Sequence, residues 1–86
     1  MTFAVVWSVI ALQEVTRLEQ AADDPAAVRE AQDRIDFALR RYPREIGESR
    51  SAGFRLWYED VLGVYYRIDE TALSVEILFA GPTRRH

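Results

Sequence analysis

The spacing of apolar residues changes at Pro43, and this change limits the folds that are open to the chain. Between residue 9 and Pro43, apolar side chains recur with the period of one face of a helix. Downstream they alternate with polar side chains, which is typical of half-buried strands. At 86 residues the chain is one domain, so its helices and strands must share one core. The sequence therefore predicts a single α+β domain over residues 1–86.

The upstream half contains two predicted helices that form a hairpin. The first runs over residues 9–22 and follows Ser8, whose side chain suits the N-cap position. The second begins at Pro25, with Asp24 as its N-cap, and ends before Pro43, since the residue ahead of a proline disfavours helical geometry. Because the linker between them is short, the two helices are expected to be antiparallel neighbours.

Four strands are predicted around this hairpin. The first precedes the helices over residues 2–7, and three more follow them near residues 54–59, 64–69 and 73–79. Short turns join the last three, which indicates an antiparallel meander. The order is thus β-α-α-β-β-β. We expect a two-layer sandwich in which the helical hairpin packs on one face of a mostly antiparallel four-stranded sheet.

The second face of this sheet is expected to stay open, because no segment remains to cover it. Alternation along the strands places six side chains on it, namely Arg55, Trp57, Tyr65, Arg67, Glu76 and Leu78. Arginine binds phosphate through paired hydrogen bonds, and aromatic rings stack on unpaired bases. The pattern therefore predicts a nucleic-acid site in which Trp57 and Tyr65 contact substrate. Arg84 and Arg85 follow the last strand and are expected to add charge at the same edge.

A structural role for the same residues is the alternative. Glu59, Asp69 and Glu76 are expected on the same face, where they would pair with the arginines. Trp57 and Tyr65 would then be a cross-strand aromatic pair that stabilises the sheet. On either interpretation, exposed apolar side chains predict that a partner peptide covers this face, or that a second copy does so in a homodimer.

Charge and composition narrow the chemistry further. All 11 cationic side chains are arginine, against 14 acidic residues, and a net charge of −3 does not fit a simple nucleic-acid binder. The chain has no cysteine and one histidine, His86, which excludes thiolate zinc sites, disulfides and histidine-based metal clusters. We expect no cofactor and no metal. No apolar run approaches the roughly 20 residues of a membrane span, so we expect a cytoplasmic protein.

Five segments together resemble the RelE/ParE toxin superfamily. They are Val5-Val6-Trp7-Ser8 with Ala11, Tyr42-Pro43 followed by Gly47 and Arg50, the stretch from Leu62 to Ile68, Val75-Glu76-Ile77-Leu78, and the Arg84-Arg85 tail. The resemblance covers essentially the whole chain and depends on the set of segments rather than on one motif. It implies the same order of elements as the periodicity does.

The resemblance implies the toxin of a type II toxin–antitoxin pair of the plasmid-stabilisation type, held silent by a cognate antitoxin. RelE-like members cleave mRNA within the ribosome, and ParE-like members inhibit DNA gyrase. Carried over by position, the catalytic residues of a nuclease would be Arg50, Arg55, Arg67, Arg84 and His86. Arginine would stabilise the pentavalent phosphate, and a general base would take a proton from the attacking 2′-hydroxyl.

The sequence also departs from the nuclease pattern. It has no lysine, no tyrosine in its tail, and Ala80-Gly81-Pro82-Thr83 where many members place a histidine and further basic residues. Three functions therefore stand side by side. The first is a metal-independent, ribosome-dependent mRNA endonuclease, and the second is a non-catalytic toxin that binds a protein such as gyrase. The third is a degenerate, non-toxic member that acts as an interaction module.

Overall fold

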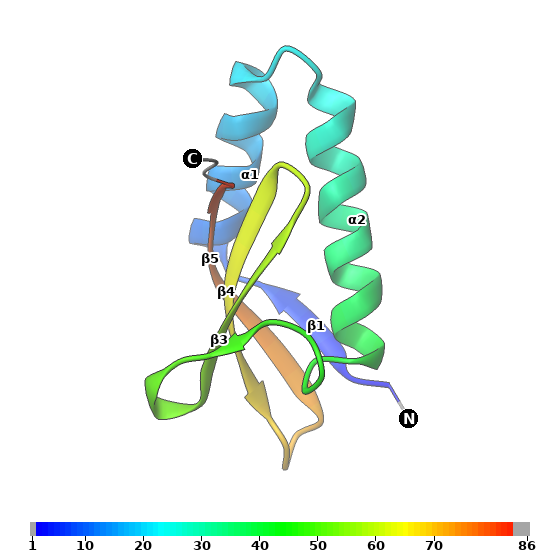
Figure 1. Cartoon of the computed structure of the whole chain (residues 1–86), viewed down its shortest axis with the longest axis vertical. Coiled ribbons are helices and arrows are strands. Elements are labelled where there is room, and N and C mark those ends of the chain that lie inside the picture. Colours follow the sequence, from blue (N-terminus) through cyan, green and yellow to red (C-terminus); the bar gives the residue numbers. More distant parts are fainter. Residues whose placement is uncertain (1, 84–86) are drawn as a thin grey trace.

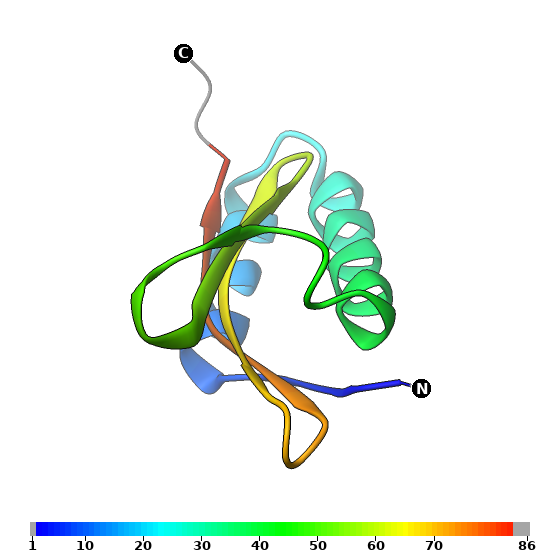
Figure 2. The same cartoon turned by 60° about the horizontal axis from the view of Figure 1, so that its bottom comes forward.

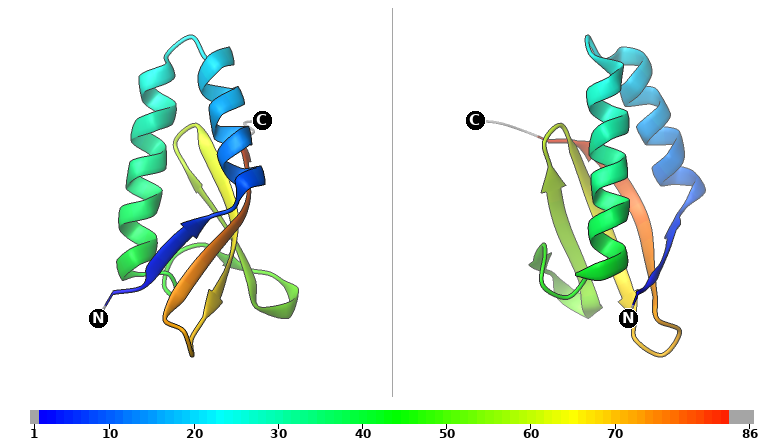
Figure 3. Two further views of the ribbon diagram at one scale, coloured as in Figure 1. Left: turned by 180° about the vertical axis from the view of Figure 1, so that it is seen from behind. Right: turned by 90° about the vertical axis from the view of Figure 1, so that its right-hand side faces the viewer.

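The structure is a computed structural model and describes residues 2–83. A helical hairpin packs on one side of a mixed five-stranded sheet, which confirms the predicted α+β class (Figure 1). Both helices lie on the same side of the sheet (Figure 3). In the described part of the chain, no helix crosses the opposite face (Figure 2). We call that opposite face the open face.

The two helices begin where the sequence predicts. Helix α1 spans Val9–Ala21 and α2 spans Pro25–Arg41. Ser8 is the N-cap of α1, since its Oγ accepts a hydrogen bond from the backbone N–H of Ala11 at 3.0 Å. The same hydroxyl donates to the carbonyl of Leu78 at 2.7 Å, which fastens the start of α1 to the sheet. Asp24 caps α2 without a side-chain hydrogen bond.

The sheet contains five strands rather than the predicted four. Their order is β1-β5-β4-β3-β2, with β1 parallel to β5 and the other pairs antiparallel. The missed strand, β2, has only two residues, too few to show an alternating pattern. The bounds are Ala4–Trp7 for β1, Glu48–Ser49 for β2, Phe54–Glu59 for β3, Leu62–Asp69 for β4 and Ser74–Pro82 for β5.

A two-residue turn at Asp60 and Val61 sets the register between β3 and β4. It places Glu59 opposite Leu62, although the sequence predicts a turn of four residues over 60–63. Asp60 has φ of 53°, in the left-handed region that aspartate tolerates. Side chains alternate along a strand, so a pairing shifted by two positions, as a four-residue turn gives, keeps the same faces together. Either turn therefore puts Trp57 on the same face as the buried residues of β4.

This register corrects the predicted positions of Arg55 and Trp57. Trp57 lies opposite Val64 and Arg55 lies opposite Tyr66, and both partners are buried against the helices. Trp57 accordingly packs against the hydrophobic core. The prediction that Arg55 and Trp57 lie on the open face is therefore wrong.

A bulge between β4 and β5 makes a second correction. Tyr66 lies opposite Ile77, but the neighbouring Tyr65 lies opposite Phe79, which leaves Leu78 as the extra residue. Phe79, predicted to be buried, consequently lies on the open face with 52% of its surface exposed. Leu78, predicted as an open-face residue, instead presents its carbonyl to Ser8.

The core lies between the helices and the covered face of the sheet. The largest fully buried side chain is Tyr66, whose ring fills space that an aliphatic residue would leave partly empty. The buried apolar residues are Phe3, Ala11, Val15, Val28, Ala31, Ile35, Leu39, Leu62, Val64, Tyr66, Val75 and Ile77.

We predict that Ser8→Ala lowers the free energy of unfolding by about 1–2 kcal/mol, because it removes both the helix cap and the contact with β5. Urea denaturation measures the change. Thr16→Ala is the control, since Thr16 is exposed on the same helix. Equal midpoints for the two variants would show that Ser8 does not join α1 to the sheet.

Candidate functional site

Three aromatic side chains, which we call the aromatic stripe, cross the open face. Phe54 on β3 stacks on Tyr65 of β4, with ring centroids 5.2 Å apart and an interplanar angle of 10°. Tyr65 in turn lies 6.4 Å from Phe79 of β5, tilted by 36°. Such pairs stabilise a sheet by about 0.5–1.5 kcal/mol each beyond their burial. Tyr65 lies on the face predicted for it, next to partners that were not predicted.

An apolar hollow of about 230 Å³ lies beside the stripe. Gly63 and Gly81 pair across its floor, and Tyr58, Tyr65 and Phe79 line it. The Tyr58 ring covers Gly63, so a Cβ added there would lie 2.6 Å from Tyr58 Cδ1. A Cβ added at Gly81 would meet no atom within 4 Å. The hollow is therefore open above Gly81.

Arg67 lies at one end of the stripe. Its Nη2 donates to Glu76 Oε1 at 3.2 Å, and its guanidinium is 5.8 Å from the centroid of the Phe54 ring. About half of each side chain of this ion pair is exposed. Arg67 thus lies on the predicted face, paired with Glu76 as the structural alternative expects.

Arg55 holds the segment that joins α2 to β3. Its Nε donates to the carbonyl of Ile46, its Nη2 to the carbonyl of Gly47 and its Nη1 to Ser49 Oγ, each at 3.1 Å. These bonds use all three nitrogens of the guanidinium. The geometry makes Arg55 an anchor for this connection, which we call the 43–50 segment.

Tyr66 holds the 43–50 segment from inside the core. Its hydroxyl lies 3.0 Å from the carbonyl of Pro43 and 2.8 Å from that of Ile46, so it donates to this pair of acceptors. Burial raises the pKa of the Tyr66 phenol, and the nearby Arg55 guanidinium acts in the opposite direction. The phenol therefore stays neutral and keeps the proton that it donates.

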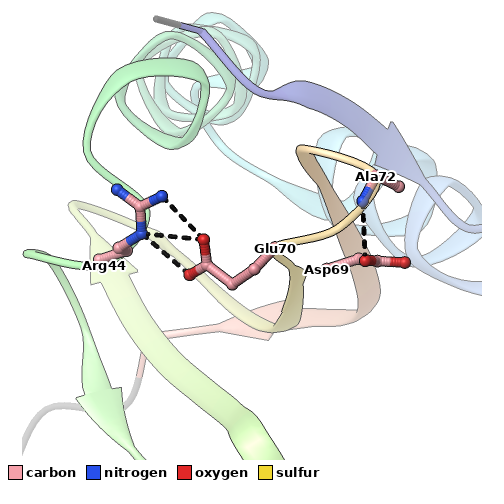
Figure 4. A network of polar contacts seen from close by, with 4 residues as sticks. All are labelled: Arg44, Asp69, Glu70 and Ala72. Atoms are coloured by element: carbon pink, nitrogen blue, oxygen red, sulfur yellow. Dashed lines mark hydrogen bonds and ion pairs between the residues drawn. The ribbon is translucent and has the colours of Figure 1, made fainter.

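A third contact ties the same segment to the turn between β4 and β5 (Figure 4). Arg44 Nε and Nη2 reach both carboxylate oxygens of Glu70 at 2.7–3.1 Å. The hydrogen bonds from Arg44 lower the pKa of the Glu70 carboxyl. Within the turn, Asp69 Oδ1 accepts a hydrogen bond from the N–H of Ala72 at 3.0 Å. The 43–50 segment is thus fixed at several points.

The predicted catalytic arginines do not form one cluster. Arg50 is exposed, bonds to Glu48 at 2.8 Å and donates its backbone N–H to the carbonyl of Phe54. Arg67 lies opposite Phe54 on the neighbouring strand β4, so Arg50 and Arg67 are on the two sides of Phe54. Arg55 lies on the other face of the sheet. Arg84, Arg85 and His86, also predicted as site residues, lie outside the described residues.

Residues 2–83 contain no group of three or more histidine, cysteine, aspartate or glutamate side chains placed to hold a metal ion. Neither α1 nor α2 is long and apolar enough to cross a membrane.

Phe54, Tyr58 and Phe79 lie on the open face, although the alternation of the sequence did not place them there. The turn itself was the available signal for the first two, because a turn of two residues, like one of four, puts Phe54 and Tyr58 on the face opposite to the buried residues of β4. Phe79 carried no such signal, since its position depends on the bulge next to Tyr66.

We predict opposite outcomes for two arginine truncations. Arg55→Ala should lower the free energy of unfolding by about 1–3 kcal/mol, because backbone carbonyls in the 43–50 segment lose their donors. Arg67→Ala should change it by less than about 0.5 kcal/mol, as is usual for an exposed ion pair. Urea denaturation measures the free energy of unfolding of both variants. An equal decrease in the two variants would contradict the anchoring role of Arg55.

Sequence comparisons and structural comparisons give different results. No protein-family model matches the chain, and no curated protein sequence matches it significantly. Solved structures do match. A chain of the toxin–antitoxin complex RelBE2 from Mycobacterium tuberculosis is similar with a TM-score of 0.78 and 23% identity, covering 96% of this chain and 100% of its own.

Two further structures have the same architecture. A chain of the chromosomal ParDE system from P. aeruginosa has a TM-score of 0.76 and 13% identity, covering 95% of this chain and 97% of its own. The isolated E. coli RelE toxin has a TM-score of 0.70 and 11% identity, covering 98% of this chain and 87% of its own. The chain therefore has the fold of RelE/ParE toxin–antitoxin structures, and the resemblance seen in its sequence is confirmed at the level of the fold.

Proposed function

We propose that the protein is the toxin of a toxin–antitoxin pair and is held by a cognate antitoxin. The support is that similar structures come from such pairs and that the similarity extends over nearly the whole chain. A small domain with several half-exposed apolar side chains also gains stability from a bound partner.

Within that role, the geometry supports a toxin that binds a protein target rather than one that cleaves RNA. The observation that carries this proposal is the position of Arg55. A nuclease centre built on the predicted arginines needs Arg55 beside Arg67, yet Arg55 points to the 43–50 segment and uses its guanidinium there. A guanidinium held at all three nitrogens by this segment is directed away from Arg67 and the open face.

The charge distribution supports the same proposal. The chain carries a net charge of −3, and its open-face arginine Arg67 is paired with Glu76. An acidic protein loses electrostatic steering towards RNA, whereas a protein target places no such demand on it. DNA gyrase is the target class that the resemblance to ParE-like toxins implies.

Ribosome-dependent mRNA cleavage remains a second candidate because of one observation. Arg50 and Arg67 are exposed on either side of Phe54, and Phe54 stacks on Tyr65. Exposed ion pairs are worth at most about 1 kcal/mol, so a phosphate would displace Glu48 and Glu76 at little cost. This mechanism would still need a general base, for which the sequence offers His86.

The test is controlled expression in a bacterial host, with and without the product of any small reading frame beside the gene. We compare the wild type with an Arg50→Ala, Arg67→Ala double variant, and Arg29→Ala, Arg34→Ala is the matched control on α2. A protein-binding toxin should arrest growth in all three forms, leave mRNA uncut and inhibit supercoiling by purified gyrase.

Three results would count against this proposal. Discrete mRNA cuts that the double variant alone abolishes would assign the nuclease function. Growth arrest with unchanged gyrase supercoiling would exclude gyrase as the target. Harmless expression without any antitoxin would indicate a degenerate member that has lost toxicity.

A further inference from the structure

We propose that a second copy of the chain covers the open face, with Phe79 of each copy inserted into the hollow above Gly81 of the other. The inference stands apart from the proposed function, since it needs neither a target nor an antitoxin. It follows from the shape of the open face, its lack of charge and its area.

The open face carries both halves of a self-complementary contact. Phe79 protrudes with 52% of its surface exposed, and open space lies above Gly81. Both residues belong to β5 and lie two positions apart, or about 7 Å, on the same face. In a two-fold dimer each copy presents the same patch to the other. A two-fold axis that lies between the two sheets, above this part of β5, therefore places each Phe79 over the partner's hollow.

The charges around the hollow favour the same occupant. No charged residue lines the hollow, and the nearest open-face charges identified on β4 and β5, Arg67 and Glu76, neutralise each other within the chain. Among residues 2–83, a phosphate-bearing ligand would meet no cation in the lining of the hollow. A second copy has an equally uncharged centre, so the contact buries no unpaired charge, which would be costly.

The size of the open face predicts a reversible dimer. With strands about 4.8 Å apart and eight residues in β4, the sheet offers on the order of 600 Å² to a partner. Standard stable interfaces bury about 800 Å² on each side. We therefore expect association that increases with concentration and is lost on dilution. The sheet is visibly twisted (Figure 2), and twisted sheets pack face to face either nearly aligned or nearly at right angles.

Sedimentation velocity over a range of concentrations tests the proposal on the purified full-length chain. The wild type should shift from monomer to dimer as its concentration rises. Phe79→Ser removes the protruding ring and Gly81→Leu fills the hollow, so each should weaken association at least tenfold. Gly81→Leu adds its Cβ into open space and should fold normally, which its urea midpoint checks. Phe37→Ser is the matched control, because Phe37 is 57% exposed on α2, and it should dimerise like the wild type.

Mixing the two open-face variants gives a sharper readout. The Gly81→Leu chain keeps its Phe79, and the Phe79→Ser chain keeps the open space above Gly81, although it loses its own Phe79 from the lining of the hollow. A mixture should therefore form heterodimers through one intact contact, more readily than either variant forms homodimers. General loss of surface hydrophobicity would not be reversed by mixing.

Several results would overturn the proposal. They are a wild type that stays monomeric at millimolar concentration, variants that associate as strongly as the wild type, and a mixture that shows no recovery. Fluorescence anisotropy with a single-stranded oligouridylate provides a second arm. Binding of this probe by a monomeric wild type, lost in Phe79→Ser, would assign the face to nucleic acid instead.

Discussion

The pairing of Glu59 with Leu62 across a two-residue turn is the constraint on which the rest of the structure depends. Because Val64 and Tyr66 must face the helices, this pairing turns Trp57 and Arg55 toward the same side. The alternate residues of β3, Phe54 and Tyr58 among them, therefore lie on the open face with Tyr65 of β4. A turn one residue longer would reverse this arrangement of β3.

The 43–50 segment is built to match that orientation. Arg55 on the covered side is a half-buried cation that needs acceptors, and the carbonyls of Ile46 and Gly47 supply them. Tyr66 adds a second donor to Ile46 from the core. Arg55, which the sequence suggested as a phosphate-binding residue, thus holds the segment that connects α2 to the sheet. The open face is left with aromatic and small residues.

The sequence was sufficient for the parts of the fold that depend on local signals. Capping and proline geometry predict three features of the helices, and all three are confirmed. Ser8 is the N-cap of α1, α2 begins at Pro25, and α2 ends before Pro43. The order of the longer strands along the chain follows from the periodicity of apolar residues. The orientation of β3 did not follow, because both of its faces carry large apolar residues and alternation alone does not say which is buried. The bulge beside Tyr66 is a tertiary feature, in which the carbonyl of the extra residue Leu78 accepts a hydrogen bond from Ser8.

The candidate site changes character as a result. The sequence predicted arginines and aromatic residues mixed on one face. In the structure, Arg55 binds the 43–50 segment on the covered side, and the aromatic stripe lies on the open face. What remains on the open face is a surface suited to protein contacts, with one paired arginine at its end. The fold of RelE/ParE toxin–antitoxin structures is therefore combined, in residues 2–83, with an open face on which the β4 arginine Arg67 is paired with Glu76.

The position of the Trp57 side chain tests the central claim most directly. Nuclear Overhauser effects from the Trp57 indole, measured on the dilute monomer, report its neighbours within about 5 Å. The account predicts contacts with the methyl groups of Val64 and Ala38, on the helix-covered side of β3. Contacts with the rings of Tyr65 and Phe79 instead would place Trp57 on the open face and contradict the register, the anchoring role of Arg55 and the proposals that depend on them.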